Sequence, residues 1–588
     1  MSPTPPSHEF LPTTPEEVRA RGWESLDVIL VTGDTYLDSP YMGVAVIGRV
    51  LADAGYRVGI IAQPDTERTE DIARLGEPAL FWGVTGGSVD SLVANRTALG
   101  KPRRQDDLTP GGRNDRRPDR AVIVYANLIR RRFKQTRPIA LGGIEASLRR
   151  ISHYDAWSDT VRRSILFDAK ADVLVYGMAE KSILEVARAL ERGTDMQCLR
   201  GICYISAQPP APCDAFPGPD VLLPAHAQVA ADKDAFVDMF RSFYTHTDSR
   251  SARRLVQQQD TRYLVHNPPA DPLSSKDLDR VYELPYNYEV HPFYAARGAV
   301  KALETIQFAL TTHRGCYGEC RFCAIAVHQG RRVVSRSRAS LLREAACFTR
   351  HRQFKGIIAD VGGPTANMYG FECRRKASKG ACAGKSCLFP RTCEKLPVNH
   401  QHQLELLRSL RSLPGVRRVF VRSGVRHDLV LADKNHGRQY LKTLLRHHVS
   451  GQLKIAPEHV VPEVLQCMGK PGREYLDAFL DLFRQVNPPD RGSKVFLTYY
   501  LLAAHPGCTL AHMQALRKYA KNALNLLPEQ VQIFTPTPST FSTLMYHTLK
   551  DPFTGNRLFV ERGIRGKQTQ KDAVLRNPNA RRRKNSKE

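Results

Sequence analysis

Short apolar runs alternate with amphipathic stretches along most of this 588-residue chain. In its first part, an apolar run at 28–31 is followed by helical spacing over 43–54 and by a second apolar run at 58–61. Unbroken apolar runs are typical of strands that are buried on both faces, and repeated strand–helix–strand units favour a parallel sheet. The alternation therefore predicts an α/β protein. A chain of this length exceeds what one hydrophobic core usually supports, so more than one domain is expected.

The alternation forms two blocks. Residues 25–205 predict a Rossmann-like, doubly wound parallel sheet, interrupted by a charged Gly- and Pro-rich loop at 100–120 that we expect to be exposed. Residues 296–555 predict a partly closed barrel of six β/α units. The apolar runs behind this second prediction lie at 306–310, 356–359, 419–421, 453–455, 495–500 and 531–534.

Three further segments lack this pattern. Residues 206–295 begin with a Pro-rich stretch, and we expect them to form a connecting region. Residues 1–24 are expected to be disordered. The C-terminal segment 556–588 ends in NPNARRRKNSKE and predicts a basic, disordered tail.

The composition bounds the setting and the partners. No stretch reaches the roughly 18 consecutive apolar residues of a membrane helix, and the N-terminus does not have the pattern of a secretory signal. We therefore expect a cytoplasmic protein without a membrane partner. The 86 Lys and Arg outnumber the 59 Asp and Glu and give a net charge of +27, which favours polyanions such as RNA at long range.

Cysteines are the residues that most clearly indicate chemistry. In a reducing compartment, clustered thiols are more often metal ligands than disulfides. Seven of the 13 cysteines fall within 316–323 and 373–393. The remaining six are scattered and are expected to be ordinary packing residues: Cys198, Cys203, Cys213, Cys347, Cys467 and Cys508.

The first cluster consists of Cys316, Cys320 and Cys323, directly after the first predicted barrel strand. One interpretation is a zinc site with His328 as the fourth ligand. The other is a [4Fe-4S] cluster, in which three thiolates leave one iron free to bind S-adenosylmethionine. The iron-sulfur interpretation also explains why the thiols follow a strand end at a barrel mouth, where reaction sites are expected.

The surrounding residues carry a family resemblance. The C-x3-C-x2-C spacing with Phe322 before the last cysteine resembles the signature of the radical S-adenosylmethionine superfamily. Over most of the chain, the resemblance is to its YgiQ family, through the motifs TTHRGCYGECRFCAIAVHQGR, DVGGPTANMYG, LKIAPEHV and LLAAHPGCT. It implies an enzyme that cleaves S-adenosylmethionine reductively with a [4Fe-4S] cluster and abstracts hydrogen from an unidentified substrate. It also implies a flavodoxin- or ferredoxin-like electron donor.

The resemblance further implies contacts to S-adenosylmethionine at the ends of the barrel strands. An acidic residue usually follows the two glycines of the motif that binds the methionyl amino group, but Pro364 stands here, so backbone groups would bind. Arg422 to Gly424 and Lys454 to Glu458 are expected to face the pocket, whereas no catalytic side chain is assigned. The predicted S-adenosylmethionine contacts are Phe322, Gly362, Gly363, Pro364, Ser423 and Glu458.

A second cysteine set lies in a Lys-, Gly- and Ser-rich insertion at 373–393. Such a segment has little apolar material for a core, so a bound metal would order it. Both a second iron-sulfur cluster and zinc are satisfied by four thiolates, and the sequence does not choose between them. The predicted ligands are Cys373, Cys382, Cys387 and Cys393.

A Rossmann-like sheet ahead of a radical barrel resembles the cobalamin-binding class, in which an Asp-x-His-x-x-Gly loop supplies the axial histidine. Asp38 and Gly43 keep that spacing, but Pro40 stands where the histidine belongs. Proline has no ligand atom, so cobalamin is not expected as a histidine-ligated cofactor. The fold could still serve as a scaffold.

Two alternatives to an enzyme of unknown substrate remain. The first is a zinc-bearing nucleic-acid-binding protein without turnover. The second is an RNA-modifying enzyme, because FTPTPST and RRVVSRSR resemble segments of methylthiotransferases.

Overall fold

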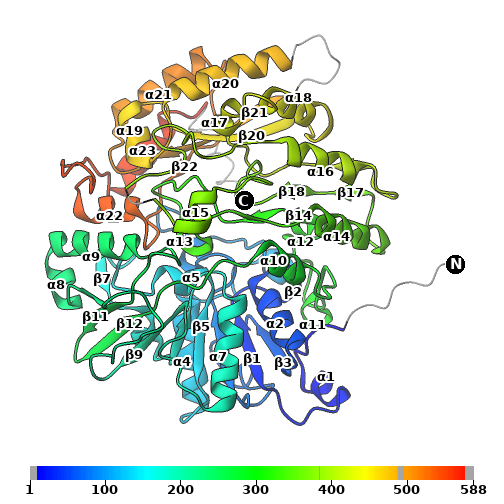
Figure 1. Ribbon diagram of the computed structural model, residues 1–588, viewed down its shortest axis with the longest axis vertical. Helices are drawn as coiled ribbons and strands as arrows, with labels where there is room; N and C mark the ends of the chain where they lie inside the picture. Colours follow the sequence, from blue (N-terminus) through cyan, green and yellow to red (C-terminus); the bar gives the residue numbers. More distant parts are fainter. Residues whose placement is uncertain (1–8, 383, 488–494, 577–588) are drawn as a thin grey trace.

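The computed structural model describes residues 9–382, 384–487 and 495–576. Within them, nine strands of the first half form one sheet, and the second half is stacked against it (Figure 1). The sheet order is β10-β11-β12-β9-β8-β5-β4-β1-β3. Its strands are β1 (Val28–Thr32), β3 (Val58–Ala62), β4 (Phe81–Thr85), β5 (Ile139–Gly142), β8 (Val173–Val175), β9 (Ile202–Ser206), β10 (Val221–Leu223), β11 (Leu255–Gln259) and β12 (Arg262–His266).

The five strands β3-β1-β4-β5-β8 are parallel, as the sequence predicts. In register, Leu30 of β1 pairs with Ile60 on one side and with Gly83 on the other. Every residue of β1 and β3 is buried, which explains their unbroken apolar runs. The strand order reverses between β1 and β4, and doubly wound sheets bind ligands at such a switch point.

The sheet continues beyond residue 205, where the sequence predicts only a connecting region. Strands β9, β12 and β11 pair antiparallel, and β10 adds to the edge in parallel. Polar side chains explain why this extension lacks an apolar signal. Gln257 and Gln259 are buried on β11, and they are bonded to each other and to Ser152.

The second half contains strands that pair in parallel: β14 with β18, β17 with β19, and β20 with β21, which in turn pairs with β22. A parallel bridge from Val425 to Ile455 links the segment after β19 to β20. Strands of the second half therefore pair with strands that lie near them in the order of the chain. These C-terminal strands are β14 (Ala309–Thr311), β17 (Ile357–Ile358), β18 (Asp360–Gly362), β19 (Arg418–Val419), β20 (Gln452–Glu458), β21 (Phe496–Ala503) and β22 (Gln532–Ile533).

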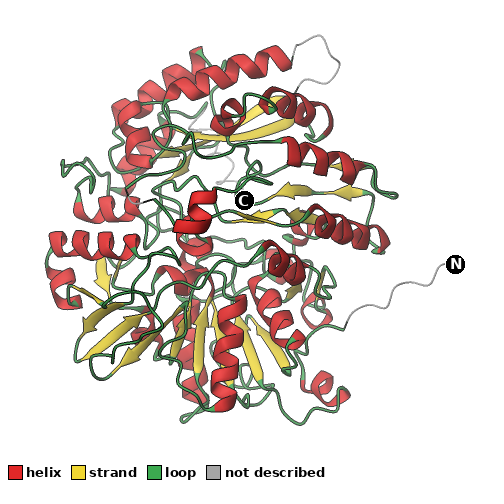
Figure 2. Cartoon of the chain, in the orientation of Figure 1, coloured by secondary structure: helices red, strands yellow, loops and turns green. Residues whose placement is uncertain are grey.

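Helices flank both sets of strands (Figure 2). The connections from β1 to β3 and from β4 to β5 run in opposite directions along the sheet. Because such crossovers are almost always right-handed, their helices are expected on opposite faces. Those of the first half include α2 (Gly43–Asp53), α4 (Ala121–Arg132), α5 (Gly143–Leu148), α6 (Ile165–Ala169), α7 (Glu180–Arg192), α9 (Lys233–Thr245) and α10 (Ser275–Tyr282). Those of the second half include α13 (Ile325–Gln329), α14 (Arg338–Arg350), α15 (Arg374–Lys379), α16 (Gln401–Arg411), α17 (His427–Ala432), α18 (Gly437–His447), α19 (Pro462–Met468), α20 (Arg473–Val486), α21 (Leu510–Asn522) and α22 (Phe541–Thr548).

The ends are more ordered than the sequence predicts. Helix α1 (Pro15–Ala20) forms inside segment 1–24, because Thr14 and Glu17 make a capping box at its start. Helix α23 (Ile564–Asp572) forms inside segment 556–588, where the Gln570 side chain accepts a hydrogen bond from Ala504 N and donates to Cys508 O. The remaining parts of these two predictions, 1–8 and 577–588, lie outside the described residues.

Two smaller expectations differ from the structure. Loop 100–120 is not wholly exposed, because Thr109 and Arg117 are buried against the sheet. Cys198 and Cys213 are joined by a disulfide rather than lying apart as separate packing residues. Across the described ranges, no helix has the length and apolar character needed to cross a membrane.

Candidate functional site

The three clustered thiols lie in the loop between β15 (His313–Arg314) and α13, and all three line one cavity of about 360 Å³, here called the thiol cavity. A turn holds the loop, since Cys323 N donates to Cys320 O at 2.9 Å and Gly318 N donates to Cys316 Sγ at 3.3 Å. A Cβ at Gly318 would stand 3.2 Å from Cys316 Sγ and 3.7 Å from Cys320 Sγ. Glycine at this position therefore leaves the sulfur atoms accessible.

Burial controls the protonation of these thiols. It raises the pKa of Cys323 to about 12, and burial together with nearby Cys320 raises the pKa of Cys316. Without a bound cation, both groups are therefore neutral thiols at neutral pH. A metal cluster deprotonates thiols and compensates their charge, so this set of three sulfur donors on one cavity fits a [4Fe-4S] cluster.

A guanidinium lies beside the thiols. Arg426 Nη1 donates to Cys320 Sγ at 3.6 Å, and its Nη2 lies 2.5 Å from Asp428 Oδ2. Burial opposes the charge of Arg426, but Asp428 outweighs it and raises the pKa of the guanidinium. Neither residue is predicted from the sequence. Their only signal is a charged pair within SGVRHD, residues 423–428, in the segment after β19.

The ligand set of the zinc alternative is not brought together. His328 Nδ1 contacts Ser147 Oγ at 3.1 Å, and the residue lines a different cavity from the three thiols. Among the residues that the structure describes, no group of three or more His, Cys, Asp or Glu side chains is arranged around a single metal ion.

The predicted S-adenosylmethionine contacts border two adjoining cavities. Phe322 and Glu458 line the thiol cavity. A second cavity, of about 490 Å³ and here called the interface chamber, lies between the carboxyl ends of the N-terminal sheet and the first C-terminal strands. It is lined by Gly362, Gly363 and Ser423, and Pro364 lines both cavities.

Local contacts fix two of these residues. Ser423 Oγ donates to Asp360, whose other oxygen accepts from Arg422 N at 2.7 Å. Glu458 lies 3.8 Å from Lys470 Nζ, and its burial raises the pKa of the carboxyl group. The side chain of Arg422 is exposed, and neither it nor Lys454 lines either cavity, contrary to the sequence expectation.

Comparison with known proteins identifies the family. A family model described as "Radical SAM N-terminal" matches residues 10–309. A UPF0313 protein of Fusobacterium nucleatum is 52% identical over 568 residues, which cover 96% of this chain and 98% of that protein. A UPF0313 protein of Thermotoga neapolitana is 47% identical over 569 residues, with the same coverage of both chains. The chain belongs to the UPF0313 (YgiQ) family of radical S-adenosylmethionine proteins.

Family membership confirms that the protein is a radical S-adenosylmethionine enzyme, and it implies a [4Fe-4S] cluster, S-adenosylmethionine and an electron donor. This outcome contradicts the alternative of a protein without turnover. The substrate is not assigned by any of these relatives, and none of them supports RNA.

Two solved structures are more distant. The radical S-adenosylmethionine methyltransferase TsrM from Kitasatospora setae, with cobalamin and a [4Fe-4S] cluster bound, is 16% identical with a TM-score of 0.46, covering 87% of this chain and 77% of that one. The cobalamin-dependent radical enzyme OxsB is 13% identical with a TM-score of 0.49, covering 90% and 56% respectively. At these scores neither comparison carries a conclusion about ligands.

Three of the four cysteines in the insertion of this UPF0313 protein come together. Cys373, Cys387 and Cys393 pack in one apolar cluster with Cys316 and Tyr317, and Cys382 lies outside it. Cys373 N donates to Tyr317 Oη at 3.0 Å, and burial raises the pKa of Cys387 to about 11. The insertion thus has more core of its own than its composition suggests, and its metal binding stays a prediction.

Asp38 and Pro40, which stand at two positions of the cobalamin-binding loop pattern, have separate roles in the structure. Asp38 forms a buried ion pair with Arg49 and accepts hydrogen bonds from the backbone and side chain of Asn287. Pro40 lines the interface chamber. The carboxylate of this loop thus fastens β2 (Leu37–Asp38) to a later segment, and the loop offers no imidazole at the position that the pattern requires.

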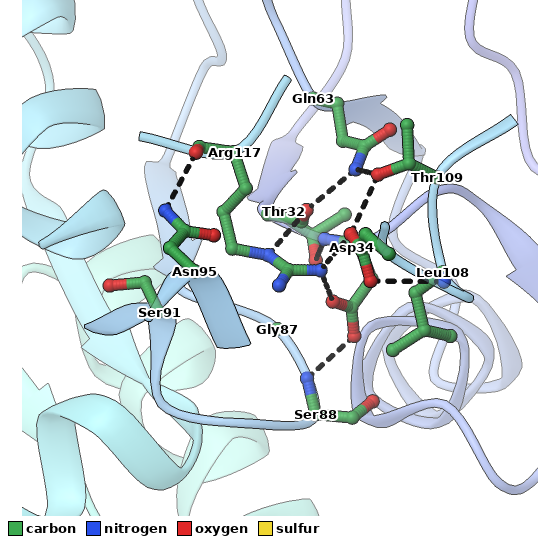
Figure 3. Close-up of polar contacts among 12 residues, drawn as sticks. Thr32, Asp34, Gln63, Gly87, Ser88, Ser91, Asn95, Leu108, Thr109 and Arg117 are labelled. Carbon is green, nitrogen blue, oxygen red and sulfur yellow. Dashed lines mark hydrogen bonds and ion pairs between the residues drawn. The ribbon is translucent and has the colours of Figure 1, made fainter. Parts of the chain in front are cut away.

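A buried network fixes the loops at the switch point of the sheet (Figure 3). Asp34, just after β1, accepts from Arg117 Nη2 at 2.8 Å and from Ser88 N at 2.6 Å. Arg117 also lies 2.9 Å from Asp106, and its Nε donates to Gly33 O at 3.0 Å. Loop 100–120 therefore holds the ends of β1 and β4 in place.

Proposed function

We propose that Cys316, Cys320 and Cys323 hold a [4Fe-4S] cluster and that this enzyme cleaves S-adenosylmethionine reductively to abstract hydrogen from a substrate. The observation that carries the proposal is that all three thiols line one cavity, beside the cationic Arg426. A [4Fe-4S] cluster held by these three thiolates would supply the one-electron reduction of S-adenosylmethionine, which yields methionine and a 5′-deoxyadenosyl radical able to take a hydrogen atom from a substrate.

Residues of this chain are assigned to bind and orient S-adenosylmethionine. We assign the methionyl end of S-adenosylmethionine to the backbone at Gly362 to Pro364, because Pro364 borders both cavities and has no side-chain donor. Ser423 and Glu458 are assigned to polar contacts, and Phe322 to apolar contact. Phe322 packs edge-on against His505 with ring centroids 6.2 Å apart, which fixes its position.

The setting of the site supports the same assignment. We propose that the C-terminal strands form an open six-stranded parallel barrel, with the thiols at its carboxyl end and the N-terminal sheet covering that end. Such enclosure excludes water and unwanted reactants from a radical. A flavodoxin- or ferredoxin-like protein is proposed as the electron donor, and no axial role for cobalamin is assigned because Pro40 has no ligand atom.

The test is anaerobic reconstitution with iron and sulfide, followed by dithionite and S-adenosylmethionine. The wild type is expected to show broad absorbance in the visible range and to release 5′-deoxyadenosine. The variant with Cys316, Cys320 and Cys323 replaced by Ala is expected to lose both signals, and Cys347→Ala, an exposed thiol on α14, is expected to keep them. Release of 5′-deoxyadenosine by the triple variant would refute the assignment.

A further inference from the structure

The interface chamber is in close reach of the thiol cavity. Ile325, at the start of α13, and Pro364, after β18, line both cavities. The two cavities are therefore neighbours, and these two residues form part of the wall between them. The chamber also lies at the carboxyl ends of β1 and β4, where the strand order of the sheet reverses.

The charged side chains that line the chamber are either ion-paired or negatively charged. Its charged lining residues are Asp34, Glu180, Asp360 and Arg314. Asp34 is paired with Arg117 as Figure 3 shows, and Arg314 is paired with Glu180. Burial also lowers the pKa of the lining imidazoles, to about 3 for His313 and about 4 for His328, so both are neutral. A phosphate or carboxylate placed here would meet three carboxylates and no unpaired cation among the described lining residues.

Two polar atoms of the chamber lining lack a hydrogen-bond partner. His313 Nε2 and Glu180 Oε2 are both buried and unpaired, on residues that are 0% and 3% exposed. Buried polar atoms are rarely left without partners, so each marks a place where a ligand can bond. The rest of the lining is largely apolar, with side chains from α2, β1, β4, β5 and α7 such as Val46, Ile47 and Ile183.

Glycines leave the chamber open along its floor. A Cβ at Gly43, the first residue of α2, would meet no atom within 4 Å, and one at Gly142 would meet only Val175 O at 3.8 Å. By contrast, a Cβ at Gly87 would lie 2.3 Å from Asp34 Oδ1, and one at Gly143 would lie 2.2 Å from Thr85 Oγ1. Both glycines line the chamber, so a larger side chain at either position has room to extend into it.

We propose that the interface chamber is the substrate site and that it takes an uncharged, largely apolar small molecule carrying a hydrogen-bond donor for Glu180 Oε2. This inference rests on the proposed function, because it places the substrate in the part of the chamber formed by the N-terminal sheet, beside the residues 362–364 and 423 that are assigned to S-adenosylmethionine. Its volume of about 490 Å³ falls within the usual range for small-molecule sites.

The test uses the reconstituted full-length enzyme and the neutral dye Nile red, whose fluorescence rises in apolar surroundings. Wild type is expected to bind one dye per chain, and Gly43→Leu is expected to weaken that binding at least tenfold. Ala54→Leu adds an apolar side chain at the exposed end of the same helix and is expected to bind the dye like wild type. Gly142→Val provides a second chamber-filling variant should Gly43→Leu fail to fold.

Equal dye affinity in wild type and in the folded filling variants would overturn the proposal. So would displacement of Nile red by a short RNA oligonucleotide, or tighter binding of the anionic dye 1-anilinonaphthalene-8-sulfonate with the same loss in Gly43→Leu, because either result would make the site anion-binding. Release of 5′-deoxyadenosine is measured in parallel. A protein that binds Nile red as expected but releases none would refute the proposed function and leave the chamber assignment standing.

Discussion

Arg426 Nη1 lies 3.6 Å from Cys320 Sγ, and the same guanidinium is ion-paired with Asp428 on its other side. The side chain of Arg426 is 11% exposed and that of Asp428 is 1% exposed, so solvent screens this arrangement weakly. A cation that donates a hydrogen bond to a cluster sulfur favours the reduced cluster, which carries one more negative charge. Arg426 is therefore placed to set how easily the cluster accepts an electron.

Replacing Arg426 by Gln is expected to lower the midpoint potential of the reconstituted cluster and to slow release of 5′-deoxyadenosine. Redox titration followed by electron paramagnetic resonance measures the potential. Because the single variant leaves Asp428 buried without its partner, at a cost of about 3–5 kcal/mol, the matched control is Arg426→Gln with Asp428→Asn. The lower potential should persist in the double variant while stability recovers. An unchanged potential in both would contradict this role.

The ion pair also predicts a dependence of stability on pH. Burial would raise the pKa of Asp428, but Arg426 outweighs it and lowers the pKa to about 2, below the ordinary value of 3.8. A depressed folded-state pKa contributes stability that is present above the unfolded pKa and is lost as pH falls toward the folded one. The stability advantage of wild type over Asp428→Asn should therefore shrink by about 2 kcal/mol as pH falls from 6, with most of the loss below pH 4.

Urea denaturation at each pH measures this difference. The exposed Asp481, whose side chain is 68% exposed in its pair with Arg484, supplies the control. Asp481→Asn is expected to change stability by less than about 0.5 kcal/mol throughout. A difference for Asp428→Asn that widens on acidification would contradict a lowered pKa for this carboxyl group.

The network at the switch point predicts a large effect from a loop residue. Arg117→Met removes the cation between Asp34 and Asp106 and leaves two carboxylates without their partner, which should cost about 3–5 kcal/mol in the free energy of unfolding. Arg104→Met, at an exposed position of the same loop, should cost less than about 0.5 kcal/mol. Urea denaturation compares the two variants, and equal stability would refute the structural role of Arg117.

The insertion cysteines predict a second metal centre that is independent of the first. The variant lacking Cys316, Cys320 and Cys323 should retain iron or zinc, because all four predicted ligands of the second centre lie within 373–393. Elemental analysis of anaerobically purified protein measures this content. Further replacement of Cys382 and Cys393 by Ser, which leaves the buried Cys373 and Cys387 of the apolar cluster in place, should remove the metal. Metal-free protein before that step would show that this set binds none by itself.

The net charge of +27 predicts contacts with RNA outside the chamber. The logarithm of affinity should fall linearly with the logarithm of salt concentration, by about 0.7 per phosphate contact on single strands. Deleting residues 577–588, which include RRRK, should reduce this slope, as measured by fluorescence anisotropy. A slope unchanged by the deletion would place the contacts on residues before 577 and would return RNA as a candidate substrate.

The sequence predicts the parts of the fold that are apolar and local. Buried parallel strands such as β1 and β3 show unbroken apolar runs. In the second half, apolar runs separated by helical segments indicate successive β/α units, and such units place strands in chain order. The antiparallel extension escapes prediction because its burial rests on polar pairs such as Gln257 with Gln259. A buried amide bonded to another amide has the same sequence signal as an exposed one.

The candidate site divides in the same way. Cys316, Cys320 and Cys323 are predictable because three thiols at fixed spacing lie on one loop. Arg426 is separated from Cys320 by 106 positions, and only the folding of β19 beside β17 brings the two together. Arg117 likewise lies in a loop whose composition indicates exposure, and its burial depends on carboxylates from two other segments.

The glycines of the interface chamber set where related enzymes can diverge. Substitution at Gly87 or Gly143 collides with Asp34 or Thr85 and strains a left-handed backbone, so both positions require glycine whatever the ligand. Gly43 and Gly142 carry neither constraint. Variation at these two sites reshapes the chamber without disturbing the sheet, which gives the lineage a route to new substrates that leaves its radical chemistry untouched.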